Sequence, residues 1–167
     1  SQAAEIIGQI LGGGASVAAM TPGVPKAPSL DDLKVKQADA YRAVDESGIG
    51  LSRSSRNQLV SDVQDAATIS DMDAILHPKA ARVSEKIAEI GPNPSISEVE
   101  RMRRVIGRNV AASPDLGERA VGMSMKDSLD DHLSSLKPGD VNASPDEAKK
   151  VIASRMDGRE MTSRIKK

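Results

Sequence analysis

The chain offers almost no aromatic side chain from which to build a hydrophobic core. Its 167 residues include no Phe and no Trp, and its single aromatic residue is Tyr41. A chain of this length can bury roughly 70% of its unfolded surface, so the core has to come from aliphatic residues and from adaptable methionines. Leu, Ile and Val supply about 21% of the residues, only slightly above the level at which order becomes doubtful. The net charge of -1 opposes disorder, because it gives the chain little self-repulsion.

Apolar residues recur at helical spacing in stretches that Pro and Gly separate. The first stretch begins at Ser29, which reads as an N-cap followed by acids in the first turn, and ends near Gly48. Ile49 and Leu51 follow in the turn and are predicted to fill the core. Further stripes are predicted over residues 52–67, 78–90, 97–110, 115–136 and 144–158. No stretch alternates like a strand, so we expect an all-α fold of about six short-to-medium helices in a bundle-like array.

Local signals predict where these helices begin and end. Ser52 or Ser54 is expected to cap the second helix, and Pro78 fits the first position of the third. Ser97 and Glu100 are expected to form a capping box at the start of the fourth helix. Gly158 is expected to interrupt the last one.

We expect three parts along the chain. Residues 1–28 form an apolar, glycine-rich segment with a proline-rich linker, residues 29–137 a helical domain, and residues 138–167 a helix with a basic arm. The first part reads as a short amphipathic helix with a glycine cap. The alternative is a membrane contact, because Gly8 and Gly12 form a GxxxG motif. Since no initiator Met precedes this segment, we expect a processed product or a piece of a longer polypeptide.

Arginines gather in two places where they could contact nucleic acid or a partner. Arg101, Arg104 and Arg108 lie on one helical face, opposite the apolar stripe. This face is either a phosphate-contacting surface or a solvated face supported by pairing within the helix. The tail over residues 149–167 includes Arg155, Arg159 and Arg164 and is expected to be either an arm ordered by a partner or a frayed terminal helix.

No constellation of residues predicts catalysis, a cofactor or a metal. Asp127, Asp130 and Asp131 are expected to face solvent, or to pair with arginines of the preceding helix. His132 is expected at the edge of the core and His77 in a turn, because neither has a metal-ligand spacing. The absence of cysteine excludes a disulfide scaffold and a thiol nucleophile. The methionines either fill the core or line a protein-binding surface.

Three segments of the chain resemble a helical region that recurs in tailed-bacteriophage and prophage proteins. These segments read LKVKQADAYRAVDESGIGLSRSSRNQLVSDV, LHPKAARVSEKIAEIG and SISEVERMRRVIGRNVAASPDLGERAVGMSMKDSLDDHLSSL. The similar features are the helix and apolar turn over 30–51, the LHPKA start at 76–80, the S-x-x-E-x-x-R-R helix at 97–104 and the acidic segment at 115–131. The resemblance covers residues 30–136, about two thirds of the chain, and it names no catalytic residue.

The resemblance implies a non-enzymatic component of the virion, of the internal, ejected or head–tail structural type, that acts by helix–helix assembly. Its expected partners are other virion proteins, copies of itself and phage DNA, and the glycine-rich start suits the end of a membrane-inserting segment. We expect the isolated chain to be monomeric or weakly associating. One alternative is a nucleic-acid-binding module that uses the arginines named above. Another is a fragment of an enzyme such as a helical cell-wall hydrolase.

Overall fold

The computed structural model describes residues 27–167. The chain divides into two units, residues 1–33 and residues 34–167. The predicted apolar, glycine-rich segment and nearly all of its linker lie outside the described residues, and so does the predicted GxxxG contact. No helix within residues 27–167 has the length and apolar character needed to cross a bilayer.

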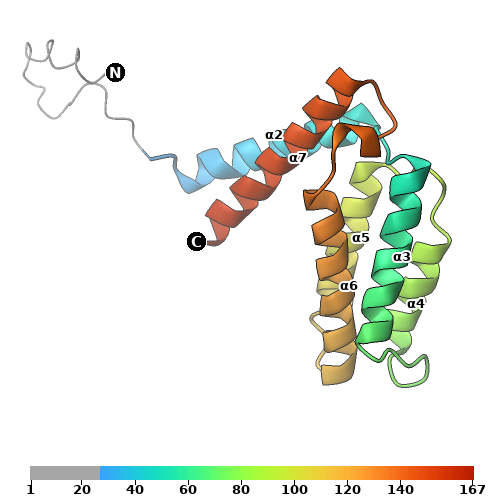
Figure 1. Ribbon diagram of the computed structural model, residues 1–167. Helices are drawn as coiled ribbons and strands as arrows, with labels where there is room; N and C mark the ends of the chain where they lie inside the picture. Colours follow the sequence, from blue (N-terminus) through green and yellow to red (C-terminus); the bar gives the residue numbers. More distant parts are fainter. Residues whose placement is uncertain (1–26) are drawn as a thin grey trace, which may run out of the picture. The chain divides into compact units, whose positions relative to one another are not determined.

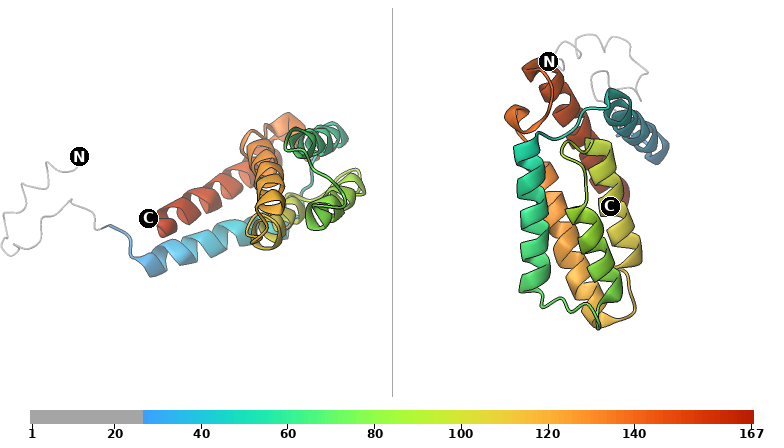
Figure 2. Two further views of the ribbon diagram at one scale, coloured as in Figure 1. Left: turned by 90° about the horizontal axis from the view of Figure 1, so that it is seen from below. Right: turned by 90° about the vertical axis from the view of Figure 1, so that its right-hand side faces the viewer.

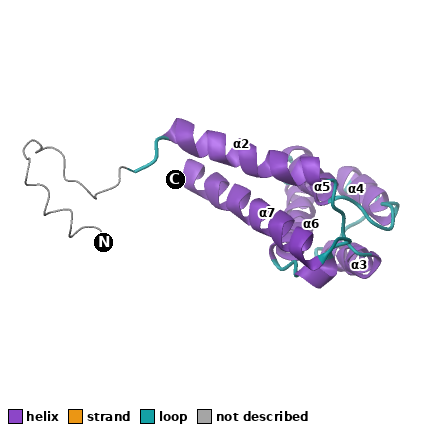
Figure 3. Ribbon diagram, turned by 90° about the horizontal axis from the view of Figure 1, so that it is seen from above, coloured by secondary structure: helices purple, strands orange, loops and turns teal. Residues whose placement is uncertain are grey.

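The described residues form six α-helices and one short 3-10 helix. They are α2 (Leu30–Ser47), α3 (Arg53–Ile69), α4 (Pro78–Ala88), α5 (Ile96–Asn109), α6 (Leu116–Ser134), η1 (Pro138–Asp140) and α7 (Pro145–Lys166). Figure 3 shows helices joined by loops, and residues 27–167 contain no strand beyond two isolated bridges, Gly50 to Ser95 and Leu51 to Val141. The predicted all-α, bundle-like fold is therefore confirmed.

Helices α3, α4, α5 and α6 lie alongside one another and enclose the core (Figures 1 and 2). Helix α6 packs along both α3 and α5, whereas the shorter α4 packs against α3 and α6. The predicted apolar stripes face inward, and burial of such side chains is the main force that holds the helices together. The fully buried core residues include Leu59, Val63, Ile87, Ile96, Ile106, Val121, Met125 and Leu129.

The turn between α2 and α3 is threaded into the core. Leu51 is completely buried, as predicted, and Ile49 packs against the same cluster. The backbone of this turn bonds to two distant loops, because Leu51 N donates to Pro94 O at 2.9 Å and Asn142 N donates to Gly50 O at 2.7 Å. These bonds fix the segment that precedes α5 and the segment that precedes α7.

Four serines and one aspartate cap the helices, namely Ser29, Ser52, Ser95, Ser144 and Asp115, although one predicted cap is wrong. Ser52 and Ser95 accept from the backbone N–H three residues on, at 3.1 and 3.0 Å. Helix α5 thus begins two residues earlier than expected, because Ile96 is buried and its N–H donates to Ile49 O at 3.0 Å. Ser97 lies inside the helix and donates to Asp45. Glu100 is therefore not part of a capping box.

Helix α7 runs without a break to Lys166, so the predicted interruption at Gly158 is wrong. From Lys34 on, α2 lies antiparallel beside α7 (Figure 3). Gln37 Nε2 donates to Thr162 Oγ1 at 2.7 Å, and the ring of Tyr41 packs on Gly158. A Cβ at residue 158 would lie 2.8 Å from Cε2 of that ring, so glycine is present to admit the ring and not to end the helix. The basic tail is an ordered helix.

Candidate functional site

A groove of about 510 Å³ lies between α4 and α5. It forms because α4 packs against α3 and α6 through its buried residues Ala80, Ser84 and Ile87 and leaves its flank toward α5 uncovered. Val83 and Ile90 of the α4 side and Met102, Val105 and Ile106 of α5 form an apolar floor. Val105 remains 44% exposed. Val83 and Met102 are partly exposed as well, whereas Ile90 and Ile106 are buried.

The charges on the rim of this groove are arranged in order. Glu89 and Glu98 lie near the loop that joins α4 to α5. Lys86 and Arg101 lie three residues further into each helix, which is about one helical turn or 4.5 Å along the axis. The groove is therefore acidic at its loop end and basic one turn away.

A buried ion cluster joins α5, α6 and α7. Glu100 is 1% exposed and accepts from Arg103 Nε at 3.0 Å and from Arg155 Nε at 3.1 Å. Asp130 lies 3.2 Å from Arg103 Nε, and Arg159 and Lys126 reach the same carboxylate at 3.7 and 3.5 Å. The cluster holds four cations and two carboxylates.

The six arginines predicted as contact residues occupy three different environments. Arg101, Arg104 and Arg108 are exposed on α5, as the spacing predicted, and Arg101 is on the rim of the groove. Arg164 is exposed and pairs with Glu160 at 2.8 Å. Arg155 is 2% exposed and Arg159 turns toward Asp130, so these two do not belong to an open basic arm.

The three aspartates of α6 also differ from one another. Asp127 and Asp131 are exposed, as expected, but Asp130 is part of the ion cluster. Its partner on the preceding helix is the buried Arg103, and not one of the exposed arginines. Sequence reasoning missed the role of Glu100, although a signal for it existed. At 100° per residue, Glu100 and Arg103 fall beside the buried face of α5.

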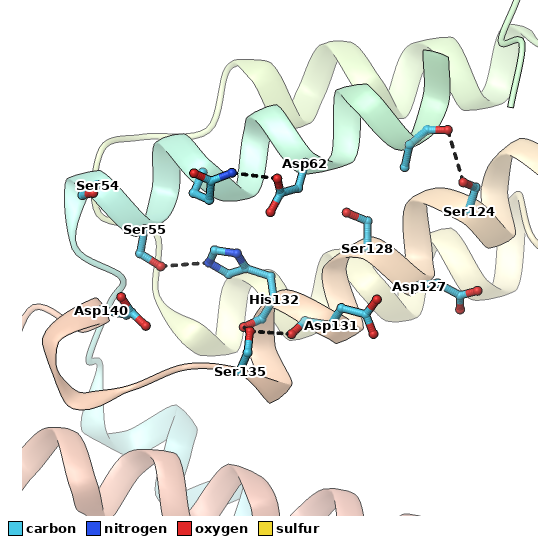
Figure 4. Close-up of a pocket in the computed structure, with 12 residues that line it drawn as sticks. Ser54, Ser55, Asp62, Ser124, Asp127, Ser128, Asp131, His132, Ser135 and Asp140 are labelled. Carbon is cyan, nitrogen blue, oxygen red and sulfur yellow. Dashed lines mark hydrogen bonds between the residues drawn. The ribbon is translucent and has the colours of Figure 1, made fainter. Parts of the chain in front are cut away.

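A polar cleft of about 710 Å³ lies between α3 and α6 (Figure 4). Hydroxyl and carboxylate groups line it: Ser54, Ser55, Asp62, Ser124, Asp127, Ser128, Asp131, Ser135 and Asp140. His132 Nε2 lies 2.8 Å from Ser55 Oγ. A serine beside a histidine resembles a nucleophile and its base, but Ser55 is only 5% exposed. The contact ties α3 to α6, and His132 lies at the edge of the core as predicted.

Burial lowers the pKa of His132 below its usual 6.5, against the opposing effect of Asp62 and Asp140. The folded chain therefore favours the neutral imidazole, and the unfolded chain binds more protons just below pH 6.5. We expect the free energy of unfolding to fall as the pH drops below about 6.5. Urea titrations between about pH 5 and pH 8 would measure this fall, and His132→Asn should reduce it. A slope that the substitution leaves unchanged would contradict the expectation.

Other polar groups of the described chain have structural roles. His77 lies in a turn, as predicted, and its Nδ1 accepts from Asp73 N at 3.0 Å. Glu118 caps the start of α4 by accepting from Lys79 N and Ala80 N. Over residues 27–167 no three His, Asp or Glu side chains are grouped to hold a metal ion.

The methionines differ in their surroundings. Met125 is fully buried in the core, whereas Met102 lines the groove between α4 and α5.

Comparison of the chain with protein-family models, with curated proteins and with solved structures finds no match.

Proposed function

We propose that this chain is a non-enzymatic bacteriophage virion component that acts through helix–helix assembly, located in the particle among other virion proteins. The observation that carries the proposal is the groove between α4 and α5, with its apolar floor and charged rim. The resemblance of residues 30–136 to helical regions of phage virion proteins supports the class of protein. The groove supports the mode of action.

The groove has the features by which proteins receive an amphipathic helix. An apolar ridge can lie on its floor while the charges on both rims set the register. A helix seated there would cover Val105, which is 44% exposed, and the partly exposed Met102. The apolar area is small and contains no aromatic anchor, so each contact is weak. Many copies acting together in a particle would supply the stability.

Incorporation into particles tests this function. We expect peptides of the chain in purified virions of the phage that encodes it, measured by quantitative mass spectrometry. Val105→Asp should lower incorporation at least about tenfold, because a carboxylate on the groove floor loses its hydration when a helix covers it. Val35→Asp is the matched control, because Val35 is 59% exposed and lies on α2 outside the groove.

Two outcomes would count against the proposal. Absence of the wild-type chain from particles would overturn the virion assignment. Equal incorporation of the Val105→Asp and Val35→Asp variants would remove the groove from the assembly. Circular dichroism of both variants checks that each remains helical, which we expect because both side chains are exposed.

A further inference from the structure

We propose that the occupant of the groove between α4 and α5 is a second copy of the same chain, placed antiparallel about a two-fold axis. This inference rests on the proposed function, because it takes the groove as the assembly surface. The groove would then bind the same groove of another copy. The order of the charges on the rim and the apolar residues of α5 on the floor both favour this partner.

The charges on the rim of one copy complement the charges on the rim of a second copy that is rotated by 180°. Its loop end carries Glu89 and Glu98, and the next turn carries Lys86 and Arg101. A two-fold axis across the groove reverses the direction of one copy, so the acidic end of each copy faces the basic end of the other. A parallel arrangement would instead set like charges against each other, which is destabilising.

The apolar residues fit the same arrangement. Met102 and Val105 lie three residues apart on α5, on the floor of the groove, and each keeps part of its surface exposed. In a two-fold pair these floor side chains of one copy pack against those of the other copy. The contact then covers Val105 of both copies at once.

This dimer is expected to be weak. The groove contains no aromatic residue, and aromatic side chains are the usual anchors of tight interfaces. We expect a dissociation constant on the order of 100 µM. Such a contact would be mostly dissociated in dilute solution and populated at the concentrations found inside a particle.

A charge-swap experiment tests the partner. An acidic variant, Lys86→Glu with Arg101→Glu, carries only acids on the rim, and a basic variant, Glu89→Lys with Glu98→Lys, carries only bases. All four residues are exposed, so the fold should tolerate these changes. Sedimentation equilibrium from about 10 µM to about 1 mM brackets the expected dissociation constant. The matched control is Arg108→Glu with Lys149→Glu, two exposed bases outside the groove.

We expect the wild-type chain and the control to dimerise alike and each variant alone to self-associate at least about tenfold more weakly. An equimolar mixture of the two variants should form a heterodimer. A wild-type chain that stays monomeric over the whole range, or a mixture that associates no better than its components, would overturn the inference. If Val105→Asp still abolished incorporation into particles in that case, the proposed function would stand and the groove would receive another virion protein.

Discussion

Substitution of Arg155 by Met is expected to lower the free energy of unfolding by about 3 kcal/mol. Arg155 is 2% exposed and donates to Glu100 Oε2 at 3.1 Å and to Ser134 Oγ at 3.2 Å. Its removal leaves one oxygen of a buried carboxylate without its donor, and a buried charge without a partner is costly. Arg103 still holds the other oxygen, which keeps the loss near the lower end of the range for broken buried pairs.

Arg164→Met is the matched control for this experiment. Arg164 belongs to the same helix and also pairs with a glutamate, Glu160, but its side chain is 50% exposed. Exposed pairs contribute about 1 kcal/mol or less, so urea unfolding should separate the two variants clearly. Equal losses at Arg155 and Arg164 would show that the buried cluster does not hold α7 in place.

Gly122→Ala is expected to lower the free energy of unfolding by about 2 to 3 kcal/mol. A Cβ at residue 122 of α6 would lie 2.7 Å from Ala111 N and 2.8 Å from the carbonyl carbon of Val110. These are backbone atoms, which cannot turn aside as a side chain can. The two segments would have to separate, and that loss outweighs the gain in helix propensity of about 1 kcal/mol from replacing glycine with alanine.

Gly107→Ala provides the opposite expectation on the neighbouring helix. A Cβ there would meet only the flexible end of Lys126, at 3.3 Å from Cε. That side chain can move, so the propensity gain should dominate and stabilise the protein by up to about 1 kcal/mol. Thermal or urea unfolding of both variants gives the signs, and destabilisation of similar size at both positions would contradict the packing argument.

The sequence predicted helices where their signals lie in neighbouring residues. Pro78 marked a helix start correctly, and of the two candidate caps Ser52 and Ser54 the structure uses Ser52, because capping depends on groups within one turn. The predicted cap at Ser97 was wrong because Ser95 and Ser97 each precede a glutamate by three residues, so the local signal is the same for both. Burial of Ile96 and the bond from its N–H to Ile49 O place the start of the helix at Ser95. That information lies in a different part of the chain.

The site was less predictable than the fold for the same reason. The ion cluster unites Glu100, Asp130 and Arg155 from three helices, and the spacing within any one helix does not show which charges will be brought together. Gly158 was read as a helix break because its meaning depends on Tyr41, a residue far away along the chain. The groove likewise results from the packing of α4 against α3 and α6. The apolar pattern of α4 or of α5 does not show which helices each of them will contact.

The threading of Leu51 beside Val141, together with the pairing of Glu100 and Arg155, has a consequence for biosynthesis. Val141 and Arg155 leave the ribosome after helices α3, α4, α5 and α6 have been synthesised. Until Arg155 emerges, the Glu100 carboxylate accepts from Arg103 and lacks its second donor. The pair that attaches α7 to the helical body can therefore form only after α7 has been synthesised.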